Sequence, residues 1–423
     1  MMRVLSTFSG ISAASCAWMP LGFEFAGYCE PAAFQSHVLN ARCDATAPKY
    51  LPADPDFAPK KYKSIVGGSV VNFGDVTQIS DDDLRALGPV DVLEGGSPCQ
   101  AFSISGLRRG LEDDRGNLTL AFADLALRMR EINGLRFVVW ENVPGVLSDE
   151  TNGFGHLMAA LASGGRGVHA LVPPGRSWPC AGHVLADDED YVQHTTLAWR
   201  VFDSQLFGLA QRRARVLLCA SFDPTVDAGS ILFEHEGTAW DPAEIGEAQQ
   251  AAPASGAGSA GELVWPPVLG TLNASGAGMS RPAGQGNELD FVLVFADGTV
   301  RRPTPLECER AQGFPDCWTD VAVGKRQALD IERYRGIGNS MSVPVMEFVG
   351  WRLMQAAEIA EKAKKARKPD PVVWLKHGWD REKDQLLTEA SIGRQPDGPG
   401  WYRQGSIDEI EQRENAGQRE MFA

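Results

Sequence analysis

Residues 90–99 read Val-Asp-Val-Leu-Glu-Gly-Gly-Ser-Pro-Cys, and the interpretation of the whole chain starts from them. The first four residues are a short apolar, β-branched run that ends near glycine, which is typical of a buried strand in a parallel sheet. The two glycines and the proline then break the strand, so Cys99 lies just beyond its carboxyl end. In open α/β sheets, ligands bind at that edge.

The segment after Cys99 reads QAFSISGLRRGLEDDRGN over residues 100–117 and is too polar to be core. We interpret it as a mobile loop whose arginines contact phosphates. A second strand, FVVWENV over residues 137–143, places Glu141 at its exit. A free cysteine is often only a small buried hydrophobe. A thiol and a carboxylate at two strand exits are, however, a recognisable catalytic pair.

Three sequence blocks resemble the cytosine-C5 DNA methyltransferase family: PCQAFSISG from Pro98, ENV from Glu141 and QRRAR from Gln211. Each block alone is weak evidence, but their order and spacing also match. The resemblance covers roughly residues 3–355. It implies an α/β fold, a doubly wound Rossmann-like methyltransferase sheet with a small inserted β-rich target-recognition domain.

The resemblance also implies a mechanism. Cys99 adds as a thiolate to C6 of cytosine, while Glu141 assists at N3, so that C5 becomes nucleophilic enough to take a methyl group from S-adenosylmethionine. Loss of the C5 proton then releases Cys99. The target base must leave the stack, and the loop after Cys99 is the expected lid. Asn142 is expected to orient this loop, and two arginines to hold the base or lower the thiol pKa. The expected catalytic residues are Cys99, Gln100, Glu141, Asn142, Arg213 and Arg215.

The expected cofactor site begins with a strand over residues 3–8, a small-residue turn and a helix, a cradle for a polar cofactor end. A second strand over residues 23–29 ends at Glu30, an acid placed to bind ribose hydroxyls. Asp75 closes a third strand and can accept from an adenine amino group. The family has a Phe-x-Gly-x-Gly turn, and here Ser12 replaces its second glycine. Pro31 stands where many members have an aromatic or aliphatic residue.

The amphipathic pattern over residues 117–132 predicts a helix packed on the sheet. Its first apolar residue matches the family position whose backbone meets the cofactor. The expected cofactor-binding residues are Phe8, Ser9, Gly10, Ile11, Ser12, Glu30, Asp75, Val76, Pro98, Leu118, Asn339 and Ser340.

Composition sets limits on the partners. The chain has 423 residues and a formal net charge of −15, which is unusual for a protein that binds a polyanion. A bound polyanion responds to the local cleft rather than to the sum. We see no signal peptide and no membrane span, and expect a cytoplasmic monomer. The eight cysteines include no Cys-x-x-Cys pair, and Cys180 with His183 lacks a partner pair, so no metal is expected.

The middle of the chain divides into two kinds of segment. Residues 164–193 are rich in Gly and Pro and then acidic, so we expect an inserted surface loop. Residues 223–300 combine linker-like stretches with a short β-rich core, including a hairpin over 291–301 that turns at Asp297-Gly298. The resemblance makes this interval the target-recognition domain. The expected DNA-contacting residues are Ser103, Ser105, Arg115 and Arg281.

After the recognition domain, Thr304-Pro305-Leu306-Glu307 predicts a capped helix start. The stretch from Gly336 to Ser340 is expected to open a long helix and, by the resemblance, to return to the cofactor. The predicted domains are therefore residues 1–222 for catalysis and cofactor, 223–300 for recognition, 301–355 for the returning segment, and 356–423 as a tail of unassigned role.

Three alternatives stay open at this point. A branch of the same family acts on transfer RNA, but a separate variable domain favours double-stranded DNA as the partner. C5 alkylation of a free pyrimidine nucleotide also uses a Pro-Cys nucleophile, but the sulfonium-binding pattern argues against it. A silent DNA-binding module is disfavoured by the intact Cys99 and Glu141. A role in restriction-modification or in phage DNA protection is compatible with the main interpretation.

Overall fold

The computed structural model describes residues 1–98, 118–163, 170–186, 195–233, 263–265, 269, 293–366, 372–380, 385–392 and 401–406. The chain divides into two compact units, Met1–Ala357 and Glu358–Ala423. Each unit has its own β-sheet.

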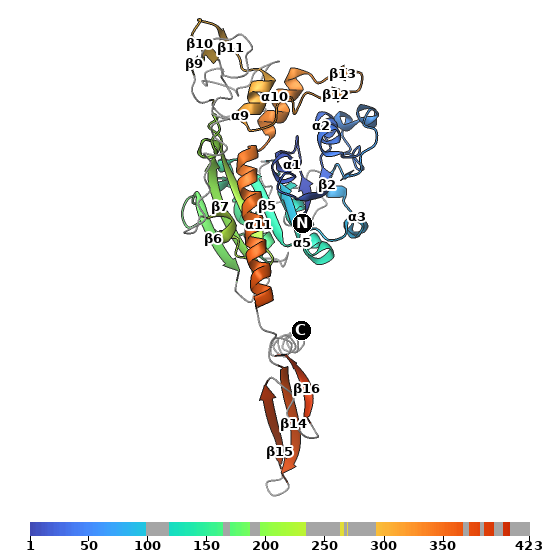
Figure 1. Cartoon of the computed structure of the whole chain (residues 1–423), viewed down its shortest axis with the longest axis vertical. Coiled ribbons are helices and arrows are strands. Elements are labelled where there is room, and N and C mark those ends of the chain that lie inside the picture. The colour runs from blue at the N-terminus through green and yellow to red at the C-terminus, as the bar shows by residue number, and fades with distance from the viewer. Residues whose placement is uncertain are drawn as a thin grey trace. The chain divides into compact units, whose positions relative to one another are not determined.

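The described residues of the first unit form an eight-stranded sheet with the order β3-β2-β1-β4-β5-β8-β7-β6 (Figure 1). Strands β1 to β5 are parallel, whereas β8, β7 and β6 continue the sheet with antiparallel pairs. The strand bounds are Arg3–Thr7 (β1), Glu24–Cys29 (β2), Val71–Asn72 (β3), Val92–Gly95 (β4), Phe137–Asn142 (β5), Ala181–Ala186 (β6), Thr195–Asp203 (β7) and Ala214–Ser221 (β8). The order reverses between β1 and β4, where ligands bind in such sheets. The predicted doubly wound fold is confirmed.

Helices cover both faces of this sheet. The helices α3 (Asp81–Leu87), α5 (Leu118–Asn133) and α6 (Gly153–Ser163) enclose a core with Leu5, Leu93 and Val138 from the strands. The predicted helix over residues 117–132 is therefore α5. On the sheet's other side, α1 (Ala13–Trp18) meets α11 (Val343–Ala366), and Trp18 Nε1 donates to the Met346 carbonyl over 2.6 Å. The last helix of this unit thus closes against the first.

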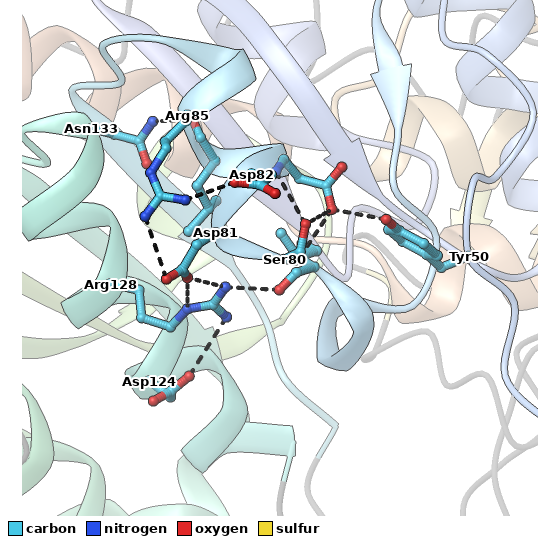
Figure 2. A network of polar contacts seen from close by, with 11 residues as sticks. Tyr50, Ser80, Asp81, Asp82, Arg85, Asp124, Arg128 and Asn133 are labelled. Atoms are coloured by element: carbon cyan, nitrogen blue, oxygen red, sulfur yellow. Dashed lines mark hydrogen bonds and ion pairs between the residues drawn. The ribbon is translucent and has the colours of Figure 1, made fainter.

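A surface polar network holds α3 to α5 beside the parallel edge of the sheet (Figure 2). Arg128 on α5 donates from Nε to Asp81 Oδ1 over 2.9 Å. Ser80 caps α3 through a capping box with Asp83, and the Tyr50 hydroxyl donates to Asp83 Oδ2 over 2.9 Å. These contacts fix the segment that follows the short strand β3.

The expectation that Gly336 to Ser340 opens a long helix is wrong. This stretch ends α10 (Asp330–Asn339), with Ser340 as C-cap in an extended conformation, and α11 begins only at Val343. Pro344 explains the break, because its ring would clash with the carbonyl of residue 340 in a continuous helix and it has no N–H to donate. Gly336 is needed for close approach, since a Cβ there would lie 3.0 Å from Ile11 Cγ2.

The expectation of a surface loop over residues 164–193 is also partly wrong, because Ala181–Ala186 forms the edge strand β6. It pairs with β7 along its whole length, from Ala181 opposite Arg200 to Ala186 opposite Thr195. The strand contains few β-branched residues, so its pattern is weak in the sequence. What it offers instead is Gly182, over which the Trp199 ring packs.

A small three-stranded sheet follows the large one, with the order β11-β10-β9. Its strands are Leu263–Trp265 (β9), Leu293–Phe295 (β10) and Val300–Arg301 (β11). The predicted hairpin is confirmed: β10 and β11 pair across a turn in which Gly298 has φ 82°. Leu293, Phe295 and Leu269 pack with Ala311 of α9 (Pro305–Ala311), so the sheet is anchored to the returning segment.

The capped start predicted at Thr304 is confirmed. Thr304 Oγ1 accepts from the Glu307 N–H over 3.3 Å, and Glu307 Oε2 accepts from the Thr304 N–H over 2.7 Å. Arg301 makes two 2.8 Å bonds to the same carboxylate. The hairpin and the helix after it are thereby joined.

The second unit contains a three-stranded antiparallel sheet with the order β15-β14-β16. Its strands are Val372–Asp380 (β14), Gln385–Ile392 (β15) and Trp401–Ser406 (β16). The interval that the sequence left without a role therefore holds regular structure. Across the described part of the chain, no helix is long and apolar enough to cross a membrane.

We predict that Gly182→Ala destabilises the first unit by roughly 1–3 kcal/mol, the usual cost of overpacking. The added Cβ overlaps the ring of Trp199, which packs in the core. Gly175→Ala is the matched control, because nothing lies within 4 Å of a Cβ there. Denaturant unfolding measures both variants, and equal stabilities would show that β6 does not pack as described.

Candidate active site

The exits of β4 and β5 meet at one point of the sheet edge. A Cβ on Gly96, just after β4, would lie 3.1 Å from Glu141 Oε2 and 3.3 Å from Met341 Cε. A side chain at this position would be tight against both groups, so the carboxylate or the methionine would have to shift by a few tenths of an ångström. The backbone that leads toward Cys99 is therefore in contact with the carboxylate that the sequence paired with it.

Glu141 is largely buried and is paired with Arg215, whose Nε lies 3.1 Å from Oε1. Burial raises the pKa of Glu141, while the positive charges of Arg215 and Arg213 oppose the rise. A raised pKa favours the protonated form of the carboxyl group, which is the form that a proton donor needs. Glu141 and Arg215, which the sequence analysis named separately as catalytic residues, are brought together as an ion pair.

Arg213 lies deeper than its predicted catalytic role requires, with only 2% of its surface exposed. Its NH2 donates to the carbonyls of Gly338 over 3.0 Å and Ser340 over 2.5 Å. A guanidinium there satisfies carbonyls at the end of α10, where helix carbonyls lack partners. Arg213 thus connects the start of β8, where Arg215 pairs with Glu141, to the returning segment. The predicted residues Asn339 and Ser340 lie at this connection.

The residue before Pro98 is held by three bonds that the sequence did not reveal. Asn142 Nδ2 donates to the Ser97 carbonyl over 2.9 Å, and Trp140 Nε1 donates to Ser97 Oγ over 2.9 Å. Ser97 Oγ also lies 2.6 Å from Thr119 Oγ1 on α5. Ser97 is 3% exposed. The exit of β4 is therefore fixed by both β5 and α5, and the only sequence signal was a small polar residue between Gly96 and Pro98.

The turn after β1 has an unusual backbone. Phe8, Gly10 and Ser12 have φ of 50°, 55° and 55°, in the left-handed region. Ser12, which replaces a family glycine, accepts the Ser15 N–H on its Oγ over 3.2 Å and so caps α1. Ser9 Oγ donates to the Ser6 carbonyl over 3.0 Å, and Ile11 is fully buried. Serine in place of glycine at position 12 disfavours the left-handed backbone but provides a side-chain cap for α1.

Glu30 lies beside this turn and is 8% exposed. Its Oε2 accepts the Gly10 N–H over 2.8 Å, and its Oε1 accepts the Ala32 N–H over 2.7 Å. Burial raises the pKa of Glu30 to about 7, although these two bonds favour the ionised form. A carboxylate offers about four acceptor positions, so two remain for a vicinal diol. Glu30 fits the ribose role.

Asp75 instead makes local bonds. It caps a short 3₁₀ turn (Val76–Gln78): Oδ1 accepts from the Thr77 N–H over 3.0 Å, and Oδ2 accepts from Gln78 Nε2 over 2.8 Å. Val76 belongs to the core, and Leu118 is the first residue of α5 and packs against that core. The predicted residues outside the described part of the chain are Cys99, Gln100, Ser103, Ser105, Arg115 and Arg281.

Among the described residues, no group of three His, Cys, Asp or Glu side chains gathers. Cys180 is exposed, and His183 Nε2 lies 3.0 Å from Asp227 Oδ1. The Asp227 carboxylate is therefore a direct partner of the His183 ring.

Glu94 is a buried acid that the sequence analysis did not consider. It is 2% exposed on β4 and accepts a bond from Ser6 Oγ over 2.7 Å. Burial raises its pKa to about 8, the Ser6 bond opposes the rise, and the Glu141 charge adds to it. Two acids on neighbouring strands thus share one buried region.

We predict that this acid makes folding stability depend on pH. Because the folded-state pKa is raised, its contribution is fully present below the unfolded pKa and is lost as the pH rises through about 8. Between pH 6 and 8, the unfolding free energy of the wild type should fall by on the order of 1 kcal/mol per pH unit more than that of Glu94→Gln. Denaturant titrations measure this, with Glu24→Gln at an exposed glutamate as control. Parallel curves for wild type and Glu94→Gln would contradict it.

Comparison with known proteins agrees with this geometry. The model of the family described as C-5 cytosine-specific DNA methylase matches residues 2–225 and 270–355. The chain is 29% identical to the DNA N-6-adenine-methyltransferase of Escherichia phage P1, over 83% of this chain and 61% of that protein. It is 26% identical to the type II methyltransferase M2.BsuMI of Bacillus subtilis (strain 168), over 66% of this chain and 64% of that protein. The chain thus spans less than two thirds of the length of either relative.

A solved structure supports the fold. The S. pombe Dnmt2 methyltransferase superimposes with a TM-score of 0.51 at 14% identity, covering 84% of this chain and 99% of that one. The family match covers both ends of the large sheet and the segment that returns to it. The chain therefore belongs to the C-5 cytosine-specific DNA methylase family.

Proposed function

We propose that the chain transfers a methyl group from S-adenosylmethionine to C5 of a flipped-out cytosine in duplex DNA. The observation that supports this best is the buried Glu141 carboxyl at the exit of β5. It is paired with Arg215 and lies against Gly96 on the path to Cys99. A thiol and an acid on adjacent strand exits suit addition across the C5–C6 bond of a pyrimidine.

In the proposed reaction, the Cys99 thiolate forms a bond to C6 while Glu141 supplies a proton at N3. Electron density moves to C5, which becomes the nucleophile. S-adenosylmethionine, when bound, supplies an electrophilic methyl group. Loss of the C5 proton to water restores the C5–C6 double bond and expels the Cys99 thiolate, and the N3 proton returns to Glu141. Asn142 acts on the loop through the Ser97 carbonyl, so it orients the nucleophile without touching the base.

We assign the proposed cofactor site to residues at the exits of β1, β2 and β3. Glu30 keeps acceptor capacity beside the turn that follows β1, and Gly10 directs its N–H to the same carboxylate. We assign ribose to Glu30. The adenine end is placed near Asp75 and Val76, with Asp75 already engaged in its own turn.

We also propose that residues 223–300 select the DNA site and that residues 301–355 complete the catalytic domain. Catalytic residues meet the same atoms in every cytosine, so sequence must be read by other side chains at base edges. The small sheet in this interval is joined to the Gln211 loop by the backbone of Leu269: its N–H donates to Ala210 over 2.8 Å and its carbonyl accepts from Arg212 over 2.7 Å. A monomer acting in restriction-modification or phage DNA protection is consistent with this organisation.

One assay tests the activity. The wild type should transfer label from S-adenosylmethionine to duplex DNA, and nucleoside mass spectrometry should identify 5-methylcytosine. Cys99→Ser should abolish transfer while keeping cofactor binding, because the thiolate forms the bond to C6. RNA and dCMP are offered in parallel. Label in RNA or dCMP alone, N6-methyladenine as the product, or turnover by Cys99→Ser near the wild-type rate would each overturn the proposal.

A second prediction concerns the cofactor. Glu30→Ala should weaken S-adenosylmethionine binding by about 1.5–3 kcal/mol, the worth of hydrogen bonds to a charged group. DNA binding should change far less, since Glu30 lies at the β2 exit beside the turn. Calorimetry for the cofactor and fluorescence anisotropy for DNA measure the two affinities. An unchanged cofactor affinity would remove Glu30 from the site.

A further inference from the structure

The turn after β1 has left-handed backbone at residues that disfavour it. Phe8 and Ser12 are not glycine, yet their φ are 50° and 55°. Such conformations cost free energy and persist only where surrounding contacts hold them. Contacts from distant segments reach this turn. They include two bonds between Ser9 and Cys29, the Gly10 N–H bond to Glu30 and a bond from Trp318.

Trp318 lies 307 positions away in the chain, and its Nε1 donates to the Ile11 carbonyl over 2.8 Å. Ile11 is fully buried and stands between two left-handed residues. The bond therefore fixes the peptide group in the centre of the turn. The donor of this bond, Trp318, belongs to the returning segment and follows α9 in the chain.

The indole is itself held in place. Arg42, near the end of α2 (Ala33–Cys43), donates from Nε to the Trp318 carbonyl over 2.9 Å and from NH2 to the Cys317 carbonyl over 2.5 Å. Its guanidinium also lies 5.8 Å from the centre of the Trp318 ring. Phe314 also packs against the indole in a tilted arrangement, with ring centres 5.9 Å apart. The indole that donates to the Ile11 carbonyl is thus itself held in position by Arg42 and Phe314.

We propose that Trp318 is a positioning residue for the cofactor turn, so that the turn takes its binding conformation only when the returning segment is docked. The inference rests on the proposed function for its ligand, S-adenosylmethionine. Trp318 acts through Ile11 and does not contact the cofactor in this assignment. It makes cofactor affinity depend on a segment that begins beyond the recognition domain.

The chain provides a matched control. Trp18 Nε1 donates to the Met346 carbonyl over 2.6 Å, which also joins the two ends of the first unit by an indole–carbonyl bond. That bond lies between α1 and α11 and not at the turn. Trp18→Phe and Trp318→Phe therefore remove the same kind of bond, and only one of the two is expected to affect the cofactor.

Trp318→Phe should raise the Kd for S-adenosylmethionine by calorimetry, and the KM for it, about fivefold, the factor expected for one ordinary hydrogen bond. Its kcat should stay near the wild-type value. Trp18→Phe should lower the melting temperature at least as much and leave Kd and KM unchanged. Arg42→Met, at an exposed side chain, should shift Kd in the same direction by less, and it serves if Trp318→Phe folds poorly.

Hydrogen exchange of the cofactor-free protein separates this inference from the proposed function. Trp318→Phe should speed amide exchange over residues 8–12, and Trp18→Phe should not. A wild type without methyl transfer would overturn the proposed function, while exchange at the turn would still test Trp318. Unchanged exchange and Kd in Trp318→Phe and Arg42→Met, or equal Kd increases in Trp18→Phe and Trp318→Phe, would overturn the inference.

Discussion

A buried carboxylate is stable only when hydrogen bonds or an opposite charge compensate for its lost hydration, and for Glu141 that compensation is a charge. Its partner Arg215 comes from β8, which runs antiparallel beside β5 and so brings its N-terminal end to the edge where β5 ends. Arg213, on the same approach to β8, reaches the carbonyls at the end of α10. The ion pair therefore joins β5 to β8, and Arg213 joins the start of β8 to the returning segment. Removing either partner would leave an uncompensated buried charge, which is far costlier than losing a surface pair.

The same region shows how a chain with a large insertion keeps its ends together. The contacts that close the first unit are specific polar bonds as well as apolar packing. Trp18 bonds to α11, and Arg352 of α11 donates to the carbonyl of Ile231 over 3.3 Å. Each bond joins a side chain from one end of the unit to a main-chain carbonyl of a segment far away in the sequence. The sheet is thus assembled from segments on both sides of the insertion.

Much of this architecture was predictable from local patterns. Short apolar strands that end in glycine, and polar residues at their exits, located β1, β4 and β5 and the carboxylate of Glu141. The hairpin at Asp297-Gly298 and the cap at Thr304 were predictable because each depends on a few adjacent residues. The break between α10 and α11 was missed because a glycine-rich stretch looked like a helix start, although Pro344 marked the boundary.

What the sequence could not predict depends on distant partners. Ser97 is an ordinary serine until Trp140 and Thr119 are brought beside it. Glu94 is unusual only because its strand is central and its neighbours are buried. The strand β6 lacks the alternation of apolar and polar residues that would identify it from the sequence, and its pairing with β7 is visible only in the structure. Each of these features depends on contacts between residues far apart in the sequence, and the spacing of apolar residues along the chain does not predict such contacts.

The joint at Leu269 consists of main-chain atoms only, since both of its bonds use the N–H or the carbonyl. These two bonds place no demand on the exposed side chains nearby, although the Leu269 side chain itself packs with Leu293 and Phe295. Exposed residues of the interval that carries the small sheet can therefore be exchanged without removing its two bonds to the Gln211 loop. Under the proposed function, such a main-chain joint lets the target preference change without rebuilding the edge of the sheet beside it.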